Sequence, residues 1–386
     1  MAVTQEFVLV PVVNMFTKSV VSLISVAAST LAQEQIYTYT PTTFSTLDLY
    51  NVTNVAPFQV YNDAFKTVLG SSPTLTNILN SSNSSFPQFH EAGIFFSETV
   101  LFVTSNQYTI SNSPSTNNKA ISITRLDLKN GSWTPTIITP QGTITLANGG
   151  TKYKDGLVFC DQGSLSAPGG LVYMNATAPY ETKSLINNYY GLEFNSPNDV
   201  FATSDGALWF TDPSYGSWQG IRPAPQLPTQ IYRYVPETND LRVVADGLLE
   251  PNGITFSPDE KTAYITDGAG NSTARTAPRT IYAYDVVTKA GQPFLANKHT
   301  FAVVQTGLPD GIKTDKAGNV YAGCGDGVNV WSEGGLFLGK IFVQGGAANF
   351  ILGTDEGGKR EQVWLLSEEK LWLAQLATVN GMGRVR

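Results

Sequence analysis

Short stretches of alternating apolar and polar residues, separated by turns rich in Gly, Asp and Asn, run along most of this chain. Period-two alternation is typical of β-strands with one buried face. The stretch "SPNDVFATSDGALWFTD" (196–212) shows the pattern clearly, because a strand, a turn and a second strand can be read in order. No long amphipathic helical period competes with it, and "NDAFKTVLG" (62–70) predicts only a short helix or turn.

This strand–turn–strand unit is repeated. "EPNGITFSPDEKTAYITD" (250–267) and "LPDGIKTDKAGNVYAGC" (308–324) share its plan of Pro, then Asn or Asp, then Asp or Gly, then an apolar residue. Weaker copies occur at 89–105, 146–162 and 346–367. Each of the six copies has one polar residue just before or at the start of its first strand, and we call it the head of the copy. The heads follow one another at spacings of 57, 50, 54, 58 and 39 residues. They are Glu91, Asn148, Asn198, Asn252, Asp310 and Asn349.

The interval between copies leaves room for two further strands, such as "QIYRYVP" (230–236) and "LRVVAD" (241–246). Four short antiparallel strands per unit, repeated at intervals of this length, are the signature of a β-propeller. The sequence therefore predicts an all-β protein in which residues 89–386 form a six-bladed β-propeller, with four antiparallel strands per blade.

Two segments precede the predicted propeller. Residues 34–88 are polar and rich in Ser and Asn, and we expect this extension to wrap the outside and to close the last blade with a strand. Residues 1–33 contain "MFTKSVVSLISVAASTLAQ" (15–33), in which a lysine precedes an apolar run and small residues. That layout is typical of a secretory signal peptide, with either Met1 or Met15 as its start.

Potential glycosylation sites also favour export. Asn-x-Ser/Thr triplets are acceptors for glycans in secreted proteins. The six triplets begin at Asn51, Asn80, Asn83, Asn130, Asn175 and Asn271. We therefore predict a secreted glycoprotein.

Composition narrows the range of partners. Charged residues make up 14% of the chain, and the net charge is −7 without a Lys/Arg block. Nucleic acid and anionic membranes are therefore poor partners, and no stable membrane span is expected in the mature chain. The two cysteines, Cys160 and Cys324, are too few for a disulfide framework. They can be small buried hydrophobic residues or form one disulfide.

The heads of the repeats carry the candidate chemistry. The innermost strand of each propeller blade lines the central channel, so residues at one fixed place on that strand converge. Local capping of strand ends explains any single Asn, but not a set that includes Glu91 and Asp310. Two carboxylates and several amide oxygens suit one hard divalent cation. Calcium is the first expectation, and Mg²⁺, Mn²⁺ or Zn²⁺ are alternatives.

The three strong motifs, together with "HEAGIF" (90–95) and "ANFILG" (348–353), resemble the SMP-30/gluconolactonase/LRE-like family of six-bladed propellers. The resemblance covers about residues 89–380 and is strongest to fungal lactonase-like members. It implies hydrolysis of a lactone or related cyclic ester, and one divalent ion held by Glu91, Asn198, Asn252 and Asp310. Ser196 stands where sugar-lactone members of the animal type have Arg, which argues against a sugar lactone as substrate.

The expected mechanism follows from the ion. A divalent cation polarises a lactone carbonyl, stabilises the oxyanion and activates water. Asp310 is the candidate general base, and Asn198 is expected to contact substrate as well as metal. Trp209 is predicted to lie in the core, whereas Tyr215 and Trp218 are predicted to roof the channel. His90 and His299 are interpreted as surface or packing residues.

The sequence leaves other functions open. The chain has no Gly-x-Ser-x-Gly elbow of a serine hydrolase, and His90-Glu91 lacks the second His of a zinc-protease helix. A propeller that keeps the ring only for binding is one alternative, because a fold does not fix its function. A non-hydrolytic Lewis-acid enzyme acting on a specialised metabolite is another. The partner expected in the main hypothesis is a small-molecule lactone.

Overall fold

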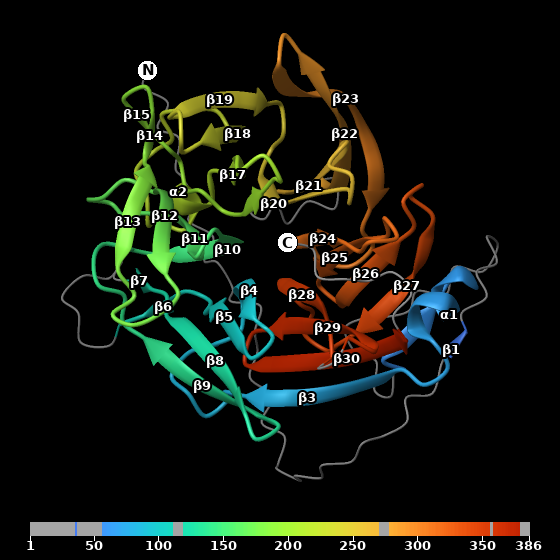
Figure 1. Cartoon of the computed structure of the whole chain (residues 1–386). Coiled ribbons are helices and arrows are strands. Elements are labelled where there is room, and N and C mark those ends of the chain that lie inside the picture. The colour runs from blue at the N-terminus through green and yellow to red at the C-terminus, as the bar shows by residue number, and fades with distance from the viewer. Residues whose placement is uncertain (1–34, 37–55, 111–118, 270–277, 356–357, 379–386) are drawn as a thin grey trace, which may run out of the picture. The chain divides into compact units, whose positions relative to one another are not determined.

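Six antiparallel sheets follow one another along the chain in a computed structural model that describes residues 35–36, 56–110, 119–269, 278–355 and 358–378. All described elements belong to one compact unit, Leu31–Arg386. The sheets are the blades of a propeller, with the inner strands around its centre (Figure 1). The prediction of an all-β, six-bladed propeller is confirmed, and within these described ranges only two short helices accompany the strands.

Each blade runs through four strands from the centre of the ring to its outer edge. In that order, blades 1 and 2 are β4 (Glu91–Ser97), β5 (Val100–Thr104), β8 (Ile123–Lys129) and β9 (Ser132–Ile138), then β10 (Ala147–Tyr153), β11 (Gly156–Asp161), β12 (Gly170–Asn175) and β13 (Thr182–Ile186). Blades 3 and 4 are β16 (Val200–Ala202), β17 (Leu208–Asp212), β18 (Gln230–Val235) and β19 (Asp240–Ala245), then β20 (Pro251–Phe256), β21 (Thr262–Gly268), β22 (Arg279–Lys289) and β23 (Gln292–Val303). Blade 5 is β24 (Ile312–Thr314), β25 (Val320–Cys324), β26 (Gly327–Trp331) and β27 (Phe337–Phe342); blade 6 is β28 (Asn349–Thr354), β29 (Arg360–Ser367), β30 (Lys370–Thr378) and β3 (Thr74–Asn80). Two short ribbons, β6 (Tyr108–Thr109) with β7 (Lys119–Ala120) and β14 (Asn188–Tyr189) with β15 (Leu192–Glu193), lie outside this order.

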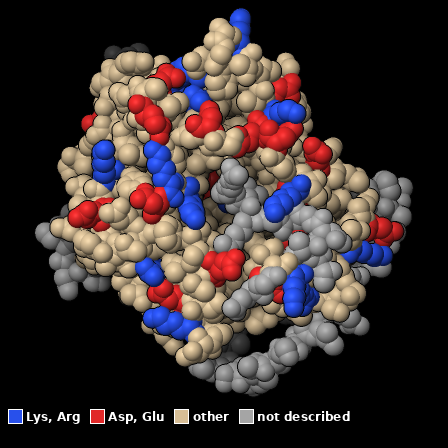
Figure 2. Space-filling view, in the orientation of Figure 1, with Lys and Arg blue, Asp and Glu red and all other residues tan. Residues whose placement is uncertain are grey.

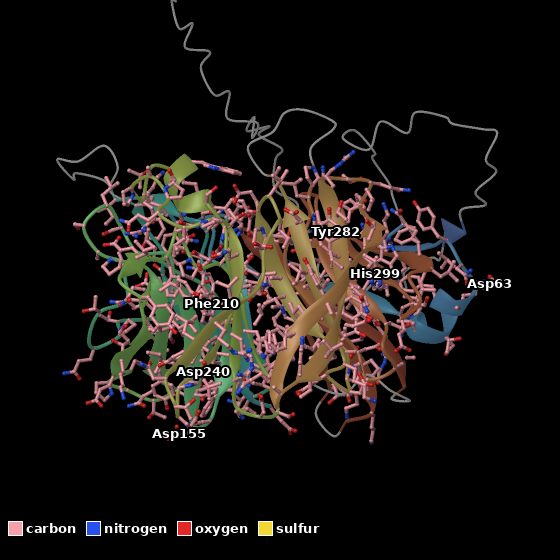
Figure 3. The ribbon with its side chains drawn as sticks, turned by 90° about the horizontal axis from the view of Figure 1, so that it is seen from above. Asp63, Asp155, Phe210, Asp240, Tyr282 and His299 are labelled. Atoms are coloured by element: carbon pink, nitrogen blue, oxygen red, sulfur yellow. The ribbon has the colours of Figure 1, made fainter. Side chains whose placement is uncertain are left out.

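Contacts between inner strands close the ring. Each inner strand neighbours that of the next blade, from β4 through β10, β16, β20 and β24 to β28, and β28 neighbours β4 again. The side view shows the strands running between the two ends of the ring, with Asp155 and Asp240 at the same end (Figure 3). Each inner strand is an edge strand of its own sheet, and the closed ring places these edges around its centre (Figure 1). There they are protected from pairing with another chain.

The N-terminal extension contributes strands to two blades. Strand β3 pairs antiparallel with β30 and forms the outer edge of blade 6. Strand β2 (Phe58–Val60) pairs with β27 of blade 5, and β1 (Gln35–Ile36) pairs with β2. Helix α1 (Ala64–Leu69) buries Phe65 and Leu69 against the same blade. The N-terminal extension therefore takes part in the sheets of both blade 5 and blade 6, the last two blades of the ring.

Hydrophobic side chains fill the spaces between blades. Trp209, predicted to be in the core, is 2% exposed and packs against Phe256 of the next blade, with ring centroids 5.1 Å apart. Phe210, on the neighbouring position of β17, faces blade 2 and stacks on Tyr232 (Figure 3). Consecutive residues of β17 thus point to opposite faces of the sheet and pack against the two neighbouring blades, as the period-two pattern requires.

Several expectations concern features away from the channel. The predicted signal peptide and the sequons at Asn51 and Asn271 lie outside the described residues. Cys160 and Cys324 are free thiols, each buried in its own blade. In the described part of the chain, no helix is long and apolar enough to cross a membrane. Figure 2 shows acidic and basic side chains interspersed over the face that it presents.

Candidate active site

The residues that head the inner strands surround a cavity of about 350 Å³ at one end of the channel. Five of the six predicted heads line it, and they come from five different blades: Glu91, Asn148, Asn198, Asn252 and Asp310. The sixth, Asn349, is fully buried and does not line the cavity. Its side-chain Nδ2 instead donates a hydrogen bond of 2.7 Å to Glu91 Oε2.

Close packing of neighbouring heads explains the glycine that follows several of them. A Cβ added to Gly253 would lie 2.5 Å from the backbone oxygen of Asp310 in the next blade. A Cβ on Gly311 would collide with the side chain of Asn349. Neither glycine has a left-handed φ, so the requirement is for space. This close approach lets the head residues meet around one cavity.

Replacing Gly253 with alanine is therefore expected to destabilise the fold, because the added methyl group must push apart blades 4 and 5. Overpacking of this kind costs about 1–3 kcal/mol of unfolding free energy. Urea denaturation of Gly253→Ala measures the loss. Gly334→Ala is the matched control, since its Cβ would meet only one atom, 4.0 Å away. Equal stability of the two variants would contradict the packing explanation.

Threonine hydroxyls tie three of the six head residues to the blade before them. The side chains of Thr211 and Thr266 donate to the backbone oxygens of Asn252 and Asp310, at 2.6 and 2.8 Å. Thr104 makes the same bond to Asn148, at 2.9 Å. The sequence analysis did not single out these ties, although three of the six second strands carry a Thr near their end, in "FVTS", "WFTD" and "YITD", which is a signal for them.

The two carboxylates of the cavity disfavour each other's ionised form. Glu91 is 3% exposed, and burial together with the nearby charge of Asp310 raises its pKa to about 8. Burial raises the pKa of Asp310 to about 6, although the positive charge of His90 opposes the shift. Two carboxylates that face each other away from water are costly unless a positive charge lies between them.

His90 was interpreted as a surface or packing residue, and the structure instead places it in the cavity wall. Its Nδ1 lies 2.8 Å from Glu368 Oε1, and Asn106 Nδ2 donates to the other Glu368 oxygen at 3.0 Å. Burial lowers the pKa of His90, but the carboxylates around it, Glu368 first and then Glu91 and Asp310, together raise it to about 9. The cavity therefore has an imidazolium–carboxylate pair at its edge. His299, by contrast, is exposed on β23 (Figure 3).

The donor set fits a hard divalent cation. Asn198 is 6% exposed, and its Oδ1 has no hydrogen-bond partner among the described residues. An unpaired buried amide oxygen is costly, and coordination of a cation would satisfy it. The described residues contain no group of three or more His, Cys, Asp or Glu side chains that could hold a metal ion by themselves. Two carboxylates supplemented by amide oxygens are ligands that calcium and similar ions accept.

The roof of the cavity is built on helix α2 (Tyr215–Trp218). Ser196 Oγ donates to Pro213 O and accepts from Gly216 N, both at 2.9 Å, and so pins the start of this turn. Tyr215 OH donates to Gly268 O, and its ring packs against Trp218. Tyr215 and Trp218, predicted to roof the channel, both line the cavity.

Fold and cavity together define a six-bladed β-propeller with an oxygen-rich site at one end of its channel. The profile of the SMP-30/Gluconolactonase/LRE-like region matches residues 101–353. The chain therefore belongs to the SMP-30/gluconolactonase/LRE-like family.

Individual relatives agree with this assignment. Lactonohydrolase oryL of Aspergillus oryzae is 35% identical over 244 residues, which cover 57% of this chain and 54% of that protein. The chain spans about half the length of these curated relatives. A gluconolactonase from Xanthomonas campestris has a TM-score of 0.63 and 25% identity, covering 84% of this chain and 96% of its own. A calcium-binding protein, regucalcin, from Agrobacterium tumefaciens has a TM-score of 0.54 and 14% identity, covering 80% and 96%.

Proposed function

We propose that this protein is a divalent-metal-dependent hydrolase that opens a lactone or a related cyclic ester in the cavity at the end of the channel. The observation that carries the proposal is the meeting of Glu91, Asp310 and the unpartnered Asn198 Oδ1 in one cavity. The names of the relatives, lactonohydrolase and gluconolactonase, support the reaction. The calcium-binding neighbour supports calcium as the ion.

Four side chains would hold the cation: Glu91, Asn198, Asn252 and Asp310. When bound, the cation would polarise the ester carbonyl and make water more acidic. Asn349 holds the Glu91 carboxylate in place, and Asn148 Nδ2 donates to the backbone oxygen of Asn198 at 3.3 Å. The Glu91 carboxylate and the backbone of Asn198 are therefore held before anything binds, which reduces the cost of assembling the site.

Asp310 is the residue proposed to take a proton from the attacking water. Its carboxylate accepts a hydrogen bond from the Asn252 side chain, and its pKa of about 6 lies near neutrality. A carboxylate with these properties can take a proton from an attacking water as the water adds to the carbonyl. The ring C–O bond then breaks and the ring oxygen takes up a proton, so that one water is consumed per lactone. The Asn198 amide is placed to contact the substrate.

Secretion and glycosylation belong to the same proposal. Among the sequons within the described residues, Asn80, Asn83 and Asn130 are exposed and Asn175 is partly buried. A glycan needs a surface asparagine, so the first three are the sites expected to carry one.

Metal removal tests the proposed function directly. We expect a chelator to abolish turnover of a panel of γ- and δ-lactones, and calcium, or else Mg²⁺, Mn²⁺ or Zn²⁺, to restore it. Mass spectrometry should show a product heavier than the substrate by one water. Full activity of the stripped protein would contradict metal dependence. A metal-loaded protein that converts no lactone would favour a binding propeller, and a product of unchanged mass would favour non-hydrolytic chemistry.

A further inference from the structure

The channel contains two charged residues that the proposed hydrolysis does not use. Asp199 follows Asn198 directly and is 3% exposed. Lys313 is the third residue after Asp310, on β24, where the other blades have uncharged residues at the matching place: Ile94, Thr151, Phe201, Thr255 and Leu352. Asp199 is buried and Lys313 is partly buried. Charged side chains are rarely buried without a partner, so the burial of Asp199 needs an explanation.

Lys313 reaches the candidate site from the opposite end of the channel. It lines a second cavity, of about 420 Å³, whose walls are formed by later positions of the same inner strands. Its Nζ donates to Asn349 Oδ1 at 3.3 Å, and Asn349 Nδ2 donates to Glu91 Oε2 at 2.7 Å. A chain of two hydrogen bonds therefore links the Lys313 ammonium to a carboxylate of the proposed cation site.

The charge of the same ammonium also acts on Asp199. Burial raises the pKa of Asp199, and the charge of Lys313 is the largest effect opposing that rise. Asp199 in turn lies close enough to affect both Glu91 and Asp310 electrostatically. The three carboxylates and Lys313 thus form one electrostatic group.

The charges of this group can be counted. Glu91, Asp199 and Asp310 contribute −3 when all three are ionised, and Lys313 contributes +1, which leaves −2 for these four residues, here called the channel core. Lys152 and Lys154 also line the second cavity, but they are exposed and are not counted. His90 and Glu368 form a pair at the edge and cancel each other. A divalent cation would bring the core to neutrality.

We propose that Lys313 sets the charge of the cation site, so that the site matches a divalent ion and disfavours a trivalent one, and that it also positions Glu91 through Asn349. This inference rests on the proposed cation site. An ammonium near a bound cation repels it in proportion to the charge of the cation. Lys313 is therefore a positioning residue that lowers affinity and supplies selectivity, in addition to stabilising the metal-free protein.

The experiment compares Ca²⁺ and Tb³⁺ binding by calorimetry in the full chain and in Lys313→Met. We expect Lys313→Met to bind Ca²⁺ on the order of tenfold more tightly and Tb³⁺ about thirtyfold more tightly, since the effect scales with ion charge. The metal-free variant should also melt at a lower temperature, because its three carboxylates lose their counter-charge. Lys313→Arg keeps the charge and should bind both ions as the unmodified protein does.

Lys152→Met is the matched control. Lys152 lines the same second cavity, but its Nζ donates to the backbone oxygen of Phe96 and has no link to Glu91. It should leave the ratio of Tb³⁺ to Ca²⁺ affinity unchanged. Equal or weaker binding of both ions by Lys313→Met would overturn the inference while leaving the cation site in place. Failure of the unmodified protein to bind either ion would overturn the cation site itself, and the inference with it.

Discussion

Replacing Asp310 with asparagine is expected to lower kcat/KM for lactone hydrolysis by about 10²–10⁴-fold, the usual contribution of a general base. Asparagine keeps the size of the side chain but cannot accept the proton from water. The substitution also removes one of the two carboxylates proposed to hold the cation, so the affinity for calcium should fall as well. Steady-state kinetics and calorimetry measure the two effects separately.

The fold should survive this substitution. In the metal-free protein, Asp310 raises the pKa of Glu91 because the two carboxylates repel each other. Asp310→Asn relieves that repulsion, and the metal-free variant is therefore expected to melt no earlier than the unmodified protein. Stabilisation by added calcium should be smaller in the variant, since a ligand that binds less tightly shifts the folding equilibrium less.

Asp315→Asn is the control for damage to blade 5. Asp315 is 1% exposed and its carboxylate accepts hydrogen bonds from two backbone N–H groups and from Tyr321, away from the cavity. Its replacement should lower the melting temperature, yet the folded protein should keep its activity. Near-normal turnover by Asp310→Asn would show that Asp310 is neither base nor essential ligand.

The sequence predicted the fold and five of the cavity residues for one physical reason. A repeated unit places equivalent residues at equivalent positions around an axis, so recurrence alone identified Glu91, Asn148, Asn198, Asn252 and Asp310 as neighbours. The order of strands within each blade followed from the period-two pattern in the same way.

Contacts that break the repeat could not be predicted in this way. His90 and Glu368 are 278 residues apart, and nothing in the pattern of either segment indicates that they pair. Asn349 occupies a repeat position, yet it does not line the cavity and instead donates a hydrogen bond to the Glu91 carboxylate. Lys313 did carry a signal, because it is charged where the other five copies are not. Departures from a repeat are thus as informative as its recurring positions.

Deleting residues 1–80 is expected to abolish cooperative folding, even though the deletion ends before the first inner strand. It removes β3, which leaves β30 without the partner that completes blade 6. It also removes Phe58 and Phe65, which are fully buried against blade 5. An exposed strand edge beside an uncovered core favours aggregation. Deletion of residues 1–33 is the control, because it leaves every described strand intact.

A single substitution gives a graded version of the same test. Phe65 on α1 is fully buried and packs so closely on Gly339 of β27 that a Cβ there would overlap its ring. Phe65→Ala should lower the unfolding free energy by about 3–5 kcal/mol, the cost of losing a buried phenylalanine and leaving a cavity. Thr67→Ala, at an exposed position of the same helix, should change it by no more than about 0.5 kcal/mol. If both variants unfold at the same urea concentration as the unmodified protein, the N-terminal segment does not stabilise the propeller, and closure of the ring depends on contacts between the inner strands alone.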